Sequence, residues 1–83
     1  MSAVLIIDDE RAIRDALKEI LEYEKYEVEE AGDGLSAIAL VKERKFDVIL
    51  CDIRMPGMDG LEVLQALQEL SDAPVVMISG HGT

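Results

Sequence analysis

Aspartates stand at the ends of apolar runs in this chain of 83 residues. Asp8 and Asp9 follow the apolar run 4–7, and Asp52 follows the apolar run 48–51. Carboxylates held close together repel one another, and a hard divalent cation such as Mg²⁺ relieves that repulsion. A bound metal with open positions can also hold a phosphoryl oxygen while a carboxylate attacks the phosphorus. These aspartates therefore suggest a magnesium site beside a nucleophile, provided that the fold brings them together.

The apolar pattern predicts four strands that alternate with three helices. Between the strands, apolar residues recur at helical spacing with charged residues among them. Regular alternation of this kind indicates an α/β fold, in which right-handed crossovers build a doubly wound parallel sheet with helices on its faces. One strand alternates with glutamates and is expected at the edge of the sheet, because its acidic face suits solvent. The predicted strands are residues 4–7, 26–31 (the edge strand), 46–51 and 75–78.

The carboxyl ends of these strands define the expected site, because ligands of doubly wound sheets bind there. The first strand would deliver Asp8 and Asp9, the third Asp52 and the fourth Ser79. Each residue also has an ordinary structural explanation. An acidic pair can cap a helix, an aspartate often opens a loop, and a serine can satisfy the backbone at a strand end. Their conjunction favours a site for a metal ion and a phosphoryl group.

Composition and charge narrow the class of protein further. A hydrophobic share of 49% argues against disorder, and a net charge of -10 argues against binding to nucleic acid or to anionic membranes. The single cysteine, Cys51, cannot form an internal disulfide, which fits a reducing compartment. Apolar runs are too short for a membrane span. We therefore predict a cytoplasmic protein of one small domain.

Three segments resemble the receiver domains of two-component response regulators. They are Ile7-Asp8-Asp9-Glu10, the nine residues 52–60 (Asp-Ile-Arg-Met-Pro-Gly-Met-Asp-Gly) and Ser79-Gly80, within a likeness that runs from Val4 to the end of the chain. The resemblance implies the flavodoxin-like order of strands, which for four strands is 2-1-3-4. The closing residues 79–83 also resemble receivers attached to sigma-54 activators of the nitrogen-regulator type.

The resemblance implies a role for each matching acidic position. Asp52 corresponds to the phosphoacceptor, which takes a phosphoryl group from a histidine kinase. Asp9 corresponds to a direct ligand of Mg²⁺, and Asp8 to a carboxylate that acts mainly through water. The main-chain carbonyl of Arg54 corresponds to a further metal ligand. Such a domain is not an enzyme acting on other molecules, although it assists its own phosphorylation and dephosphorylation.

The resemblance also implies a switch and an output. Ser79 corresponds to the hydroxyl that turns toward the phosphoryl group, and Gly80 to the small residue that leaves room for it. The resulting change of shape would control an output domain, in this case one expected to regulate transcription. A phosphatase with an aspartate nucleophile is disfavoured. That class needs a second aspartate two residues after the first, and Asp8 is followed there by Glu10.

Compared with the family, the chain departs from the pattern at its end. Complete receivers continue through a fourth helix, a fifth strand and a fifth helix, so residues 1–83 are expected to be a receiver truncated before these elements. The family's lysine after the fifth strand is also missing, and phosphorylation of this chain is therefore expected to be slow or undetectable. The fourth strand would be an open edge, and the sheet face beside the first helix would be bare. The alternative to signalling is therefore self-association, by edge pairing, exchange of elements or burial of the bare face.

Overall fold

The computed structural model describes residues 2–52, 54–55 and 58–78, with residues 54–55 and 58–60 described by their backbone only. The described elements alternate between strands and helices along the chain, apart from one short pair of strands before the last helix. They are β1 (Ala3–Ile7), α1 (Arg11–Tyr23), β2 (Glu27–Ala31), α2 (Gly34–Glu43), β3 (Val48–Asp52), β4 (Arg54–Met55), β5 (Met58–Asp59), α3 (Gly60–Leu70) and β6 (Val75–Ile78).

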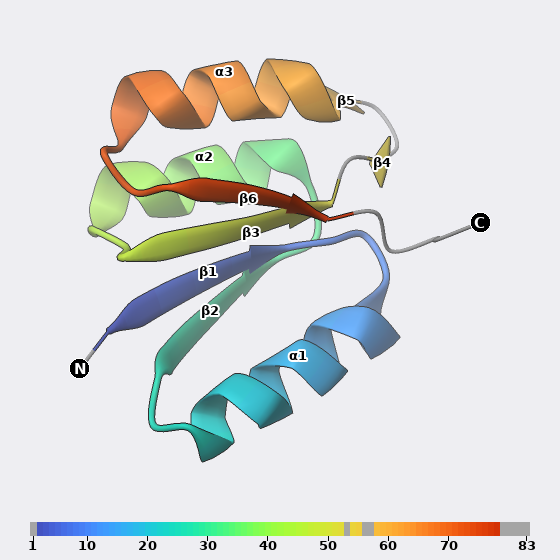
Figure 1. The fold of residues 1–83 in the computed structure, drawn as a ribbon. Coiled ribbons are helices and arrows are strands. Elements are labelled where there is room, and N and C mark those ends of the chain that lie inside the picture. Colours follow the sequence, from blue (N-terminus) through green and yellow to red (C-terminus); the bar gives the residue numbers. More distant parts are fainter. Residues whose placement is uncertain (1, 53, 56–57, 79–83) are drawn as a thin grey trace.

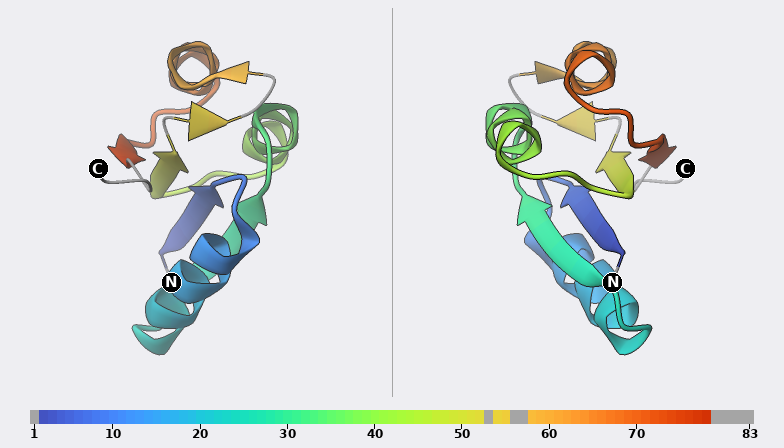
Figure 2. Two further views of the ribbon diagram at one scale, coloured as in Figure 1. Left: turned by 90° about the vertical axis from the view of Figure 1, so that its right-hand side faces the viewer. Right: turned by 90° about the vertical axis from the view of Figure 1, so that its left-hand side faces the viewer.

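The four longer strands form one parallel sheet in the order β2-β1-β3-β6. Helix α1 lies on one face of this sheet, and α2 and α3 lie on the other (Figures 1 and 2). The predicted flavodoxin-like arrangement, with strand order 2-1-3-4, is confirmed. The acidic strand β2 lies at an edge, where its glutamates reach solvent, as its alternating pattern predicted.

Strand β1 is the centre of the fold, and all five of its residues are buried. Neighbouring side chains of a strand point to opposite faces of the sheet. Leu5 and Ile7 therefore pack with Ile49 and Cys51 of β3 in the core beneath α2 and α3. The continuous apolar run of β1 is explained by this position, because both of its faces are covered.

Helix α2 begins at a well-defined cap. The carboxylate of Asp33 accepts a hydrogen bond of 2.7 Å from the backbone N–H of Ser36. This bond satisfies one of the first N–H groups of the helix, which have no partner within the helix itself. The sequence Gly-Asp-Gly at 32–34 predicted a break in the chain here, and the structure shows that it starts the helix.

The buried sides of α2 and α3 differ from the predicted apolar stripes. Leu35 and Leu61 belong to the apolar residues that recur at helical spacing, but their exposed fractions are 76% and 62%. Both lie in the first turn of their helices. Val41 and Leu67, which belong to the same apolar spacing, do reach the core, together with Ala37 of α2 and Val63 of α3.

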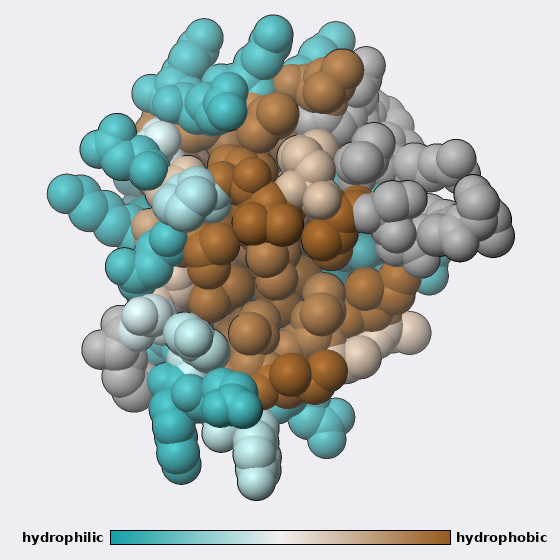
Figure 3. All heavy atoms as spheres, viewed as in Figure 1, coloured by the Kyte–Doolittle hydropathy of each residue, from teal (hydrophilic) through white to brown (hydrophobic). Residues whose placement is uncertain are grey.

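The face of the sheet that carries α1 is only partly covered. Helix α1 packs over β1 and β2, and none of its residues is fully buried. Beside it lies an apolar surface across β3 and β6 (Figure 3), which we call the open face. Val76 on this face is 47% exposed, whereas Val75 and Met77 on the other side of β6 pack against the core. The open face consists of Val48, Leu50, Val76 and Ile78.

One further element was not predicted. The segment after β3, expected to be a loop, contains the short antiparallel pair β4–β5, in which Arg54 pairs with Asp59 and Met55 with Met58. Strands of two residues are too short to show an apolar period, which explains why the sequence pattern did not predict them. Among the described residues, no helix is both long and apolar enough to cross a membrane.

Candidate metal and phosphoacceptor site

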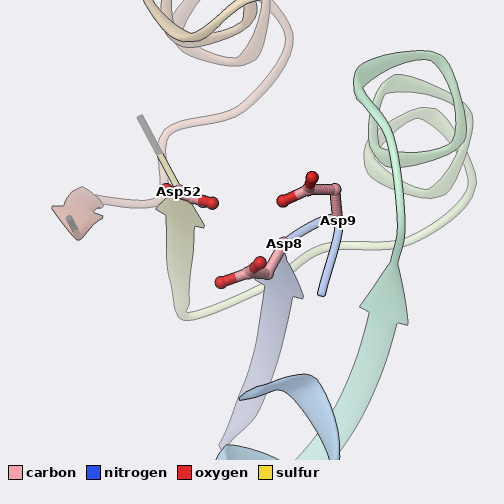
Figure 4. Close-up of side chains that lie close together, drawn as sticks. All are labelled: Asp8, Asp9 and Asp52. Atoms are coloured by element: carbon pink, nitrogen blue, oxygen red, sulfur yellow. The ribbon is translucent and has the colours of Figure 1, made fainter. Parts of the chain in front are cut away.

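The acidic site lies at the carboxyl ends of β1 and β3, which are neighbours in the sheet. Ile7 pairs with Cys51, so the next residues, Asp8 and Asp52, lie side by side. Figure 4 shows Asp9 just beyond them, with its carboxylate pointing toward that of Asp52. One carboxylate oxygen from each of the three aspartates can be chosen so that all lie within 4.8 Å of one another. The convergence expected from the sequence is therefore observed.

Burial makes this cluster electrostatically costly. Asp8 and Asp52 have no exposed surface, whereas Asp9 is exposed. Burial raises the pKa of the Asp8 carboxyl, and the charges of Asp52 and Asp9 raise it further, against the lowering effect of a hydrogen bond from the Glu10 backbone. Because these carboxylates are close together and partly shielded from water, a positive charge bound among them would be favourable.

The oxygens of Asp8 show that the site suits a hard cation. Its Oδ1 accepts a hydrogen bond of 2.9 Å from the backbone N–H of Glu10. Its Oδ2 is buried and has no hydrogen-bond partner among the described residues. A buried carboxylate oxygen without a partner is unfavourable, and a cation ligated by oxygen would satisfy it. Capping of α1 does not explain the pair, because the N-cap residue is Glu10. The residues present therefore fit Mg²⁺.

The backbone of Asp8 is anchored by residues that the sequence analysis missed. Its N–H donates to the carbonyl of Ala31 over 3.1 Å, and its carbonyl accepts a hydrogen bond of 2.5 Å from Arg14 Nη1. Arg14 Nε in turn lies 3.2 Å from Glu30 Oε1. The available signal was the arginine itself, which follows Ile13 on the apolar side of a helix, where a charged side chain needs a partner.

Cys51 has a structural role in the core. It is fully buried, and its Sγ lies 3.5 Å from the carbonyl oxygen of Asp52. Burial, together with the charges of Asp52 and Asp8, raises the pKa of the Cys51 thiol to about 11. A thiol that stays protonated at neutral pH is a poor nucleophile and a poor metal ligand.

The other predicted site residues are described only in part. Arg54 lies in β4, two residues after Asp52, and is described by its backbone. Ser79 and Gly80 lie outside the described residues. Their roles as metal ligand, switch hydroxyl and small residue beside the phosphoryl group stay predictions.

Comparison with protein families matches residues 4–83 to the response regulator receiver domain. Among curated proteins, the transcriptional regulatory protein ResD of Bacillus subtilis (strain 168) is 42% identical over 79 residues. This match covers 95% of the chain and 33% of ResD. The chain thus spans about a third of the length of this relative.

Two solved structures are similar over the whole chain. One is a complex of the histidine kinase ThkA with the response regulator protein TrrA, with a TM-score of 0.90, 34% identity and coverage of 100% of this chain and 72% of that chain. The other is a response regulator from Burkholderia pseudomallei with a phosphorylated aspartic acid, a calcium ion and citrate. Its TM-score is 0.92 and its identity 27%, with coverage of 100% of this chain and 49% of that chain.

Proposed function

The chain belongs to the response regulator receiver domain family, and we propose that Asp52 takes a phosphoryl group from a histidine kinase while Mg²⁺ is bound beside it. The observation that carries this proposal is the position of Asp52, buried at a strand end and within 4.8 Å of oxygens of Asp8 and Asp9. The similar regulator from Burkholderia pseudomallei, which has a phosphorylated aspartic acid and a calcium ion, supports it.

In this proposal, each acidic residue has a separate task. Asp8, Asp9, Asp52 and the carbonyl of Arg54 would hold Mg²⁺, and the ion would supply positive charge for the phosphoryl oxygens. A carboxylate oxygen of Asp52 attacks the phosphorus, the phosphorus–nitrogen bond to the donor histidine breaks, and the imidazole leaves with the bonding electrons. Asp52 is buried at the end of β3, which restricts the orientations that its carboxylate can adopt.

The proposed consequence is a change of shape that controls an output. A phosphoryl group adds negative charge and strong acceptor oxygens, to which the hydroxyl of Ser79 would turn, with Gly80 leaving the space. We propose that residues 1–83 are the receiver part of a longer cytoplasmic regulator of transcription and end before its fourth helix. Support comes from ResD, which is named as a transcriptional regulatory protein and of which the chain spans 33%. The likeness to sigma-54 activators stays a prediction.

Phosphotransfer is tested by incubating the chain with a small phosphodonor such as phosphoramidate and locating the added mass by peptide mass spectrometry. We expect slow labelling of Asp52 that requires Mg²⁺ and is absent from Asp52→Asn. Asp72→Asn, which changes an exposed aspartate of the same chain, should be labelled like the unchanged protein. Labelling that persists in Asp52→Asn, or that does not require Mg²⁺, would contradict the proposal.

The open face favours a second candidate function, self-association. Its four apolar residues include Val76, which is 47% exposed, and β6 has no strand on its outer side among the described residues. Exposed apolar surface and open strand edges both promote pairing of chains. Absence of donor-dependent labelling of Asp52 in the full-length parent protein, together with a concentration-dependent mass of this chain in light scattering, would favour self-association over signalling.

A further inference from the structure

The loop between β1 and α1 is tied to β2 through Arg14. The guanidinium of Arg14 donates from Nη1 to the main-chain carbonyl of Asp8 over 2.5 Å, and its Nε lies 3.2 Å from Glu30 Oε1. Only 17% of the Arg14 side chain is exposed, so water competes weakly for these bonds. Three consecutive elements of the fold, β1, α1 and β2, therefore meet at one side chain.

These contacts leave one oxygen of Asp8 for a ligand. Its N–H is bonded to Ala31, its carbonyl to Arg14 and its Oδ1 to the N–H of Glu10. Oδ2 is buried without a hydrogen-bond partner among the described residues, and the carboxylate to which it belongs is part of the acidic cluster. Fixing the other polar groups of Asp8 sets the direction in which this oxygen points.

We propose that Arg14 is a positioning residue for the magnesium site, because it holds the Asp8 carbonyl and thereby aims the Asp8 carboxylate at the bound cation. The proposal rests on the proposed function, in which the acidic cluster binds Mg²⁺. Groups that orient metal ligands from behind commonly change metal affinity by an order of magnitude or more.

Holding the Asp8 carbonyl in this way requires an arginine at position 14 and space around its guanidinium. A guanidinium presents several N–H groups in one rigid plane, so that it can bond a carboxylate and a carbonyl together, which a single ammonium group does poorly. Gly32, just after β2, provides the space. A Cβ atom at this position would lie 3.2 Å from Arg14 Nη1, closer than ordinary contact allows without a shift. The glycine therefore keeps the guanidinium in reach of Asp8.

If Arg14 acts on the metal site only through its charge, its removal should have the opposite effect on Mg²⁺ binding from the one expected if it positions Asp8. As a cation near the site, Arg14 would repel Mg²⁺, and its removal would tighten metal binding. As a positioning residue, its removal would weaken binding. Lys18 provides the matched control, because its Nζ lies 3.4 Å from Glu30 Oε2 and thus contacts the same glutamate. No hydrogen bond joins Lys18 to Asp8 among those described for the two residues.

The test is titration of the 83-residue chain with Mg²⁺ by isothermal calorimetry. We expect Arg14→Met to weaken Mg²⁺ binding by about tenfold, and Lys18→Met to leave it unchanged or slightly tighter. Arg14→Lys, which keeps the charge but loses the planar fork, should also weaken binding. Gly32→Ala should weaken binding as well, and should have no further effect in a chain that already carries Arg14→Met, because both changes act through the same guanidinium.

A structural readout separates positioning from general loss of stability. Amide hydrogen exchange of Glu10 should become faster in Arg14→Met than in Lys18→Met, because the Glu10 N–H is bonded to the Asp8 carboxylate. If Arg14→Met does not fold, Arg14→Lys and Gly32→Ala decide the question by the same titration. An unchanged chain that fails to bind Mg²⁺ would overturn the proposed function. Equal or tighter binding by the Arg14 variants, with binding intact in the unchanged chain, would overturn the role of Arg14 alone.

Discussion

Asp8 is buried beside two other carboxylates, and this surrounding raises the pKa of its carboxyl above the ordinary value of 3.8. When the folded protein holds a proton more tightly than the unfolded chain does, ionisation of the group weakens the fold. The cost of Asp8 is thus absent below its ordinary pKa and fully present above its raised pKa. The proposed binding of Mg²⁺ would require the ionised carboxylate, so the same rise in pH that weakens the metal-free fold should strengthen metal binding.

Replacement of Asp8 by asparagine should therefore stabilise the metal-free chain at pH 7. Asparagine keeps an oxygen for the N–H of Glu10 but removes the buried charge, and repulsion between charges at such distances is worth on the order of 1 kcal/mol or more. A gain of about 1 kcal/mol raises Tm by roughly 4–8 °C in a domain of this size.

Thermal unfolding in buffer without divalent cations measures this effect. The gain in Asp8→Asn should shrink as the pH falls through the raised pKa of the folded chain, and it should be absent below 3.8, where Asp8 of the unfolded chain is protonated as well. Added Mg²⁺ should reverse the order of stability, because only the unchanged chain keeps all three carboxylates. Asp72→Asn serves as the control at an exposed position. Lower stability of Asp8→Asn at pH 7 without metal would show that the carboxylate is a net benefit to the fold.

At the same scale, the acidic residues of the site could be predicted from the sequence, but the residues that hold them in place could not. Asp8, Asp9 and Asp52 were identified because each follows an apolar run, and parallel strands bring their carboxyl ends to one edge. Arg14 and Glu30 lie 16 positions apart in sequence, on different elements. Only the packing of α1 against β2 brings them together, and no local pattern encodes that contact.

At the scale of elements, apolar spacing predicted which segments are helices better than it predicted which side they bury. Leu35 and Leu61 fit a helical stripe, yet both are exposed. A spacing of three or four residues defines a stripe along a helix, but it does not tell how far the helix extends past the sheet that it covers. The spacing therefore could not tell whether the leucines of the first turns are buried. Val41 and Leu67, in later turns, do reach the core.

The N-terminal cap of α2 should contribute measurably to the stability of the fold. Asp33→Ala should lower Tm by roughly 4–8 °C, as expected for the loss of one capping interaction in a small domain. The hydrogen bonds from Ser36 lower the pKa of Asp33, so its contribution is fully present above 3.8 and is lost as the pH falls through the lowered pKa. The deficit of the alanine variant should accordingly vanish in acid.

Unfolding curves across this pH range give the measurement. Asp72→Ala, which removes an exposed aspartate outside the helices, is the control and should change Tm little. A deficit for Asp33→Ala that stayed constant down to low pH would mean that the carboxylate does not act as the cap.

At the scale of the whole molecule, two properties have opposite effects on the association of copies of this chain. The chain carries a net charge of -10, which keeps copies apart, while the open face attracts other apolar surface. Salt screens the repulsion and leaves the attraction between apolar surfaces in place. If chains associate through the open face, added salt should therefore increase association.

Substitution of Val76 by lysine tests the open face directly. Light scattering of the unchanged chain should give a mass that rises with protein and salt concentration, and Val76→Lys should abolish that rise. Leu35→Lys is the matched control, because Leu35 is apolar and 76% exposed but lies on α2, on the opposite side of the sheet. An equal effect of the two lysines would indicate that charge alone, and not the open face, controls association.

Cys51 allows the rate at which the centre of the sheet opens to be measured in the unchanged chain. It is the sole cysteine, it is fully buried in a central strand, and its thiol stays protonated at neutral pH. A thiol reagent can modify it only while β3 is exposed, so the rate of modification reports how often the centre of the sheet opens. The modification rate of Cys51 therefore measures the opening motions of β3, the strand that also carries Asp52.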